Sequence, residues 1–234
     1  MTKEVIPMKK WLALVALPLT YTVGATLYER TKTSSRITRS LASLNALYLT
    51  FDDGPHPYYT PQLLDVLKRY DAKATFFVVG ELAQKYPHLL RRMHEEGHAI
   101  GIHHFTHKSA WQLTPHQLQQ QIEQTRRIIY AITGVHTHLY RPPWGHFNAA
   151  SMHIAKHDYI VLWSHIFKDW KATHNNLHLL KHPIEDGSIL LLHDNGDTRG
   201  ADSTAPSVML KALEKFLATA TQQFLALPGE DDEC

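Results

Sequence analysis

The chain has 234 residues, of which 44% are hydrophobic and 20% charged, so it is long enough for one substantial globular domain with a short appendage. The formal net charge of +2 is too small to indicate a nucleic-acid-binding protein. Cys234 is the single cysteine, which excludes a disulfide framework and a cysteine-ligated zinc site.

The N-terminal segment has the pattern of a targeting sequence. Lys9 and Lys10 precede an apolar run that reaches Tyr28, and Val23 with Ala25 has the small-residue spacing of a cleavage site. The run is also about long enough to span a membrane if it is not cleaved. Both interpretations predict that the protein acts outside the cytoplasmic membrane.

Three regions follow from this pattern. We expect residues 1–28 to be a signal peptide or a membrane anchor. Residues 29–44, rich in Thr, Ser and Arg, are expected to form a linker, and residues 45–234 to form the main domain.

Within the main domain, short apolar runs alternate with patterns of helical period. Thr114 before Pro115 is typical of a helix start, while Gly97 and Gly134 are typical of helix ends. Such alternation favours a parallel sheet with helices outside it. The predicted strands are 46–51, 74–79, 99–102, 139–141, 159–163 and 189–192, and the predicted helices are 61–70, 87–96, 115–133 and 205–217.

Two adjacent carboxylates, Asp52 and Asp53, end the first predicted strand and precede Gly54-Pro55. Because side chains alternate along a strand, neighbouring aspartates point in different directions. One can therefore bind a metal ion while the other faces a substrate. The alternative is a plain acidic turn, which Asp and Gly also favour.

His103 and His107 are separated by the spacing that places two imidazoles on one side of a helical turn, within reach of one metal ion. With 18 histidines in the chain, such a pair carries little weight alone. His94 and His98 with Glu95 fit the H-E-x-x-H pattern of zinc peptidases. We disfavour a peptidase because Gly97 falls where that helix would have to continue.

Three further polar clusters follow predicted strands. They are Arg141-Pro142-Pro143-Trp144-Gly145, Asp169-Trp170 and the His193-Asp194 pair after Leu190-Leu191-Leu192. Taken singly, each is explained by a loop or by packing. Together with the aspartate and histidine motifs they lie at the C-terminal ends of strands, which form the catalytic face of β/α barrels.

In this order, the motifs resemble the polysaccharide deacetylases, the NodB-homology domain of carbohydrate esterase family 4, over about residues 45–227. The resemblance implies an α/β fold, a distorted (β/α) barrel with about seven strands and a catalytic site at the C-terminal ends of the strands. It also implies metal-dependent hydrolysis of N-acetyl groups from peptidoglycan-like or chitin-like glycans, with release of acetate.

The resemblance assigns a role to each site residue. Asp53, His103 and His107 would hold a divalent metal ion, zinc in the first place and cobalt as the alternative. Asp52 would be the general base, oriented and kept ionised by Arg141.

On the substrate side, the backbone N–H of Trp144 would stabilise the oxyanion, and Leu191 would line the acetyl pocket beside Trp170. His193 would be the general acid, oriented and kept cationic by Asp169.

Three departures from the family pattern stand out. His104 replaces a usual Ser or Thr after the first metal histidine, Ile166 replaces a frequent acidic residue, and Trp144 replaces a commoner Tyr. Two other functions stay open: an O-acetyl esterase acting on a xylan-type polysaccharide, and a non-catalytic glycan-binding relative. The expected partners are an N-acetylated polysaccharide and, if the N-terminal segment is retained, the membrane; no nucleic acid is expected.

Overall fold

A computed structural model describes residues 16–32, 35–172 and 183–231. Its centre is a nine-stranded sheet in the order β1-β7-β6-β4-β3-β2-β9-β8, with β10 beside β2, and all of these neighbours pair in parallel. The strands are β1 Ile37–Thr38, β2 Ala46–Asp52, β3 Ala74–Val78, β4 Ala99–Ile102, β6 Leu139–Tyr140, β7 Tyr159–Val161, β8 His165–Ile166, β9 Ile189–His193 and β10 Gln223–Phe224.

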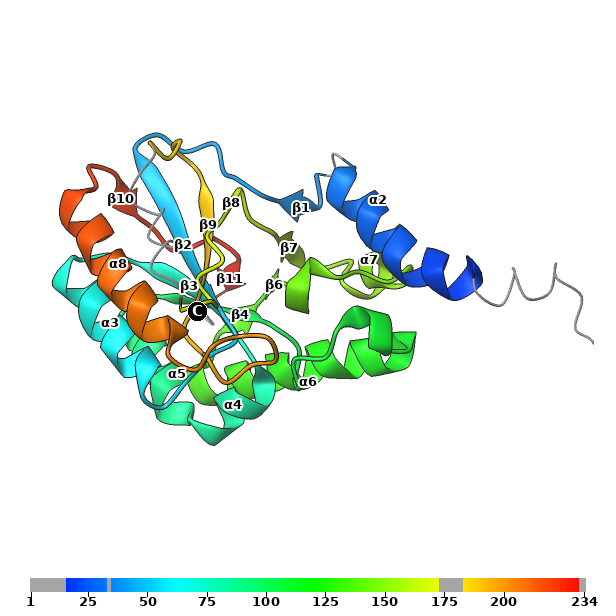
Figure 1. Cartoon of the computed structure of the whole chain (residues 1–234). Coiled ribbons are helices and arrows are strands. Elements are labelled where there is room, and N and C mark those ends of the chain that lie inside the picture. The colour runs from blue at the N-terminus through cyan, green and yellow to red at the C-terminus, as the bar shows by residue number, and fades with distance from the viewer. Residues whose placement is uncertain (1–15, 33–34, 173–182, 232–234) are drawn as a thin grey trace, which may run out of the picture.

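Helices cover the outside of this curled sheet. Figure 1 shows α3 and α8 side by side, α4, α5 and α6 continuing around the sheet, and α2 on the opposite side near β1 and α7. The helices are α2 Ala25–Thr31, α3 Tyr59–Arg69, α4 Gly80–Lys85, α5 Pro87–Glu95, α6 Pro115–Thr133, α7 Ser151–Ile154 and α8 Ala205–Thr219. Single turns are η1 Thr20–Gly24, η2 Ala110–Gln112 and η3 Pro143–Gly145, and β5 His136–Thr137 pairs antiparallel with β11 Glu230–Asp231. The predicted distorted (β/α) barrel is confirmed.

Strand β2 lies at the middle of the sheet between β3 and β9. All seven of its residues are buried, as expected for a parallel strand that is covered on both faces. Its last residue, Asp52, is in register with Phe77 of β3 and His193 of β9. The sheet therefore brings the C-terminal ends of these strands, and the polar motifs that follow them, to one edge.

Local signals place several helix ends where the sequence predicts them. The Thr114 side chain accepts a hydrogen bond from the Gln117 N–H, and the Gln117 side chain accepts one from the Thr114 N–H, which begins α6 at Pro115. Gly134 ends α6 in the left-handed conformation with φ 77°. In the same way, Gly97 follows α5 with φ 78°.

Two elements differ from their predicted bounds for a visible reason. Helix α3 begins two residues before Pro61, because the His56 ring accepts hydrogen bonds from the N–H groups of Tyr58 and Tyr59. Strand β7 ends at Val161 rather than at 163. The carbonyls of Val161 and Leu162 accept hydrogen bonds from a buried arginine side chain instead.

The segment before the main domain is helical from residue 16 and packs on the domain. Thr26 of α2 is 3% exposed, and its hydroxyl donates a hydrogen bond to the Phe147 carbonyl. The region expected as a linker starts with the end of α2 and contains β1. Residues 1–15, which carry the basic part of the expected targeting segment, lie outside the described residues. Among the helices that the structure describes, none is both long and apolar enough to cross a membrane.

Candidate active site

A pocket of about 370 Å³ opens at the C-terminal ends of the central strands. Eight of the ten residues that the sequence predicts for the site line it. They come from the end of β2 and the residue after it, the loop after β4, η3, the loop after β8, and β9. They are Asp52, Asp53, His103, His107, Trp144, Trp170, Leu191 and His193. The other two, Arg141 and Asp169, lie directly behind the pocket wall, where each contacts one of these side chains.

Asp53, His103 and His107 bring one ligand atom each into a cluster in which all three atoms lie within 4.8 Å of one another. Oδ1 of Asp53 is 3.3 Å from Nε2 of His103 and 2.9 Å from Nε2 of His107. Burial would raise the pKa of the Asp53 carboxyl, but the hydrogen bonds to the two histidines hold it well below its usual range. A carboxylate and two imidazoles are ligands that suit a divalent ion such as zinc.

The surroundings of the cluster also fit a metal ion. Nδ1 of His103 donates a hydrogen bond to the carbonyl of Arg141 at 2.8 Å, which leaves Nε2 free to act as a ligand. The second carboxylate oxygen of Asp53 accepts a hydrogen bond of 2.8 Å from Thr198. If all three side chains bound one metal ion, positions would stay open on that ion, as catalytic metal sites require.

Asp52 is 3% exposed and pairs with Arg141, which is fully buried. Nη1 of Arg141 donates to Oδ1 of Asp52 at 2.7 Å and to the hydroxyl of Thr50 at 2.8 Å. The remaining donors bond the carbonyls of Val161 and Leu162. The guanidinium is therefore fixed from several sides, and it holds one oxygen of Asp52 while the other faces the pocket, 3.9 Å from Nε2 of His103.

His193, the last residue of β9, lines the pocket and is held by Asp169. Nδ1 of His193 is 2.9 Å from Oδ1 of Asp169, and the backbone N–H of His193 donates to Oδ2 at 2.7 Å. Burial would lower the pKa of His193, but the charge and hydrogen bond of Asp169 raise it to about 9, with help from the charges of Asp53 and Asp52. His193 can therefore carry a proton at neutral pH.

Aromatic and aliphatic side chains surround these polar groups. The Trp144 ring is 41% exposed and lies 4.4 Å from the ring centre of His107, on a backbone with φ 56°. The Trp170 ring meets His193 edge-on at 5.3 Å. Ile166 is 45% exposed and lines the pocket.

His104 anchors the loop that carries His103 and His107. It is fully buried, and its Nδ1 donates to the Lys108 carbonyl at 2.7 Å while Nε2 lies 2.8 Å from the Tyr140 hydroxyl. Burial lowers the pKa of His104 to about 3, so the ring is neutral and Nε2 accepts the hydroxyl proton. The imidazole makes two hydrogen bonds in the place of a Ser or Thr, so the departure leaves the loop anchored.

The peptidase pattern does not form a site. Helix α5 ends at Glu95, and the chain turns at Gly97. His98 is buried against Phe76, and its Nδ1 accepts a hydrogen bond from the N–H of Ala74. The second histidine of the motif is thus a core residue, and the peptidase interpretation is wrong.

Sequence reasoning missed five residues that contribute to the site. Thr198 and Asn195 bond the side chain and the carbonyl of Asp53, and Arg30 and Arg199 line the pocket. Thr50, which supports Arg141, could have been found because it lies two residues before Asp52 and so shares its side of the strand. No sequence pattern links Arg30 to the site, because only the tertiary packing of helix α2 brings Arg30 to the pocket.

An open parallel barrel with a carboxylate and two histidines converging at its strand ends defines a class: β/α-barrel proteins whose site can hold a catalytic metal ion. A family model described as polysaccharide deacetylase matches residues 42–160. The chain belongs to this polysaccharide deacetylase family.

Curated relatives agree with that assignment. The chain is 39% identical over 158 residues to the peptidoglycan-N-acetylmuramic acid deacetylase PdaA of Bacillus subtilis, covering 63% of this chain and 59% of the relative. It is 36% identical to a peptidoglycan-N-acetylglucosamine deacetylase of Bacillus cereus, covering 71% of this chain and 81% of the relative. The match to PdaA thus spans less than two thirds of that protein.

Solved structures share the fold. The Bc1960 peptidoglycan N-acetylglucosamine deacetylase superposes with a TM-score of 0.72 at 30% identity, covering 82% of this chain and 90% of the other. Peptidoglycan deacetylase PdaC from Bacillus subtilis gives 0.65 at 33% identity, covering 78% and 88%.

Proposed function

We propose that the protein is a metal-dependent deacetylase that hydrolyses N-acetyl groups on cell-wall or chitin-like glycans and releases acetate. The observation that carries the proposal is that two pairs, Asp52 with Arg141 and Asp169 with His193, each bring one member into the pocket that the Asp53 cluster lines. The relatives named as deacetylases of N-acetylmuramic acid and N-acetylglucosamine support it.

In this proposal Asp52 is the general base. Its free oxygen faces the pocket, and Arg141 keeps the carboxylate oriented. Asp52 takes a proton from the water that attacks the acetyl carbonyl carbon. A divalent ion held by Asp53, His103 and His107 would polarise that carbonyl and make the water more acidic.

His193 is the general acid in the second half of the reaction. The carbon–nitrogen bond breaks, the acetyl group with the oxygen added from water leaves as acetate, and Nε2 of His193 gives a proton to the departing amine nitrogen. Because Nδ1 bonds Asp169, Nε2 is the nitrogen left to face the pocket. Leu191 would line the space for the acetyl methyl, and the backbone N–H of Trp144 would stabilise the developing oxyanion.

The proposal also includes the metal and the location of the enzyme. We infer zinc, with cobalt able to replace it, because a carboxylate with two imidazoles matches the ligands that zinc prefers. We infer action outside the cytoplasmic membrane from the basic and apolar pattern of residues 1–28 and from relatives named for cell-wall substrates. Fractionation of cells that make the full-length protein tests the second inference, and recovery in the cytosol contradicts it.

Acetate release from purified peptidoglycan, chitin oligosaccharides and acetylated xylan tests the activity. The expected result is acetate from an N-acetylated glycan, and loss of that acetate in Asp52→Asn. Release from xylan alone would identify an O-acetyl esterase, which uses the same residues. No release from any glycan by the metal-loaded protein would contradict a catalytic role.

A further inference from the structure

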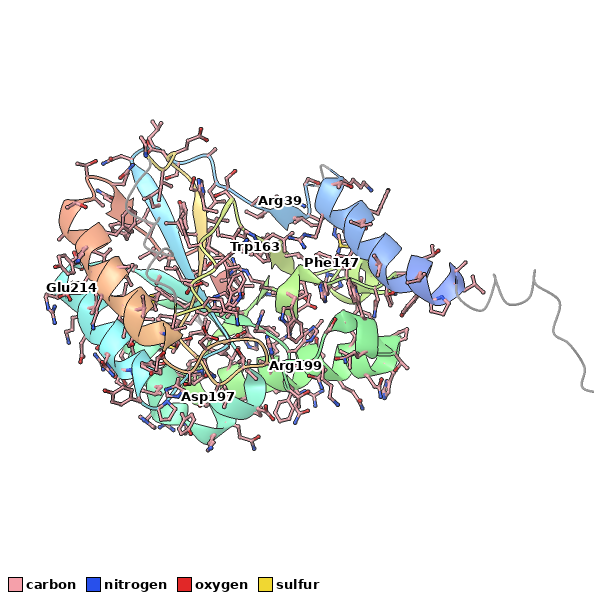
Figure 2. All side chains as sticks on the ribbon, in the orientation of Figure 1. Arg39, Phe147, Trp163, Asp197, Arg199 and Glu214 are labelled. Atoms are coloured by element: carbon pink, nitrogen blue, oxygen red, sulfur yellow. The ribbon has the colours of Figure 1, made fainter. Side chains whose placement is uncertain are left out.

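Two arginines at the rim of the pocket are not used by the proposed reaction. Arg30 comes from helix α2, which precedes the main domain in the sequence, and Arg199 comes from the loop between β9 and α8. Both side chains are exposed, and both line the pocket that contains Asp52, Asp53 and His193. Figure 2 labels Arg199 at the loop that connects β9 to α8.

Helix α2 is fixed in position, so Arg30 is presented to the pocket by a defined contact. The hydroxyl of Thr26, one turn earlier, accepts hydrogen bonds from the N–H of Phe147 at 2.9 Å and from Nε1 of Trp111 at 2.8 Å. Cζ of Arg30 lies 5.6 Å from the ring centre of Trp163, whose indole also lines the pocket. The Trp163 ring thus helps to hold the Arg30 guanidinium at the rim of the pocket through a cation–π contact.

Arg199 lies where the pocket meets a neighbouring groove. Beside the pocket is a groove of about 380 Å³, and Arg199 and Trp144 line both. The groove also exposes part of the Trp111 ring. A glycan whose acetylated sugar sits in the pocket would extend a neighbouring unit past Arg199.

Among the residues that the structure describes, no carboxylate neutralises the positive charges at the rim. Throughout residues 16–32, 35–172 and 183–231, neither Arg30 nor Arg199 has a carboxylate within ion-pair distance. The carboxylates of the pocket have other partners, since Asp52 bonds Arg141 and Asp53 contacts two histidines. The charge of Arg30 acts on a neighbouring side chain: burial lowers the pKa of His146, and the Arg30 charge lowers that pKa further.

We propose that Arg30 and Arg199 recognise an anionic group on the glycan, so that the enzyme prefers strands with a carboxylate next to the acetylated sugar over neutral strands. A guanidinium offers several N–H donors in a planar fork that matches a carboxylate. This inference rests on the proposed deacetylase function and adds its substrate class.

The test compares two substrates that differ only in charge. One is peptidoglycan glycan strands without stem peptides, whose muramic units carry a free carboxylate, and the other is the same strands with each carboxylate converted to a methyl amide. The wild type should show a higher kcat/KM on the acidic strands. Arg30→Gln and Arg199→Gln should each reduce the ratio of acidic to amidated kcat/KM by roughly 3- to 10-fold, the range of one exposed to partly buried ion pair.

Arg127→Gln is the matched control, because Arg127 is exposed on α6 and lines a different hollow. It removes the same charge and should leave the ratio unchanged. High salt should reduce the wild-type preference, since exposed charges are screened. A wild-type ratio near one, or a ratio that neither rim variant changes, overturns the recognition of an anion. Absence of acetate from both strands would instead overturn the deacetylase function itself.

Discussion

One carboxylate, that of Asp169, holds His193 through both of its oxygens: Oδ1 lies 2.9 Å from Nδ1 of the ring, and Oδ2 accepts the backbone N–H at 2.7 Å. The contact fixes the ring relative to its own backbone and places a negative charge beside it. Orientation and protonation of the proposed general acid therefore depend on the same side chain.

Replacing Asp169 with Asn should move the basic limb of the rate profile to lower pH. Burial favours neutral His193, and the Asp169 charge is what raises its pKa to about 9, so loss of that charge lowers the pKa. An acid with a lower pKa deprotonates earlier as pH rises. A metal ion would lower the pKa in both proteins, so the comparison is made between metal-loaded enzymes. An unchanged basic limb in pH profiles of kcat/KM would show that His193 is not the acid.

Asp52→Asn and Asp53→Asn should fail in different ways. Asp53 contacts both histidines of the cluster, so its amide variant should lose bound metal. Asp52 bonds Arg141 instead, and its variant should keep the metal while kcat falls by at least ~10²-fold, as loss of a positioned base implies. Metal content measured with rates decides between them. The reverse pattern would mean that the two roles are exchanged.

Removal of divalent metal should abolish acetate release, and zinc or cobalt should restore it. Affinity should fall as pH drops, because His103 and His107 must be neutral to bind. His107→Ala should lose the metal in equilibrium dialysis, whereas His157→Ala, an exposed histidine elsewhere, should retain it. Full activity of the chelated protein would exclude this centre.

His104→Ala should destabilise the metal-free protein by about 1–3 kcal/mol, since it leaves the Lys108 carbonyl and the buried Tyr140 hydroxyl without their partner. Urea unfolding of this variant, of Tyr140→Phe and of the double variant gives the coupling between the two side chains. His116→Ala, on the exposed face of α6, serves as the control. Additive effects of the two substitutions would argue against the hydrogen bond.

The elements that could be predicted are those with a strong local signal. Helix α6 was located to the residue because Thr114, Pro115 and Gly134 mark both of its ends. Strands β2, β3, β4 and β9 are mostly apolar and four to seven residues long, whereas β1, β8 and β10 have two residues each, too few for any period to emerge.

The proposed site likewise contains residues that the sequence could predict and residues that it could not. Residues in motifs, such as Asp52-Asp53, could be named from the sequence because their order resembles a family. Asn195 and Thr198 support Asp53 through loop geometry that no spacing encodes. The contact of Arg30 with Trp163 joins positions 133 apart in the chain, which only the packing of α2 brings together.

The hydrogen bonds of Arg141 make the enzyme's activity a probe of its folding. Its side chain bonds β2 through Thr50 and Asp52, and it bonds the chain just after β6 to the end of β7 through two carbonyls. Asp52, the proposed general base, is positioned only when these strands are already assembled, so partly unfolded molecules should have no residual turnover. Loss of acetate release in denaturant should therefore coincide with global unfolding, and catalysis becomes a direct reporter of the intact barrel.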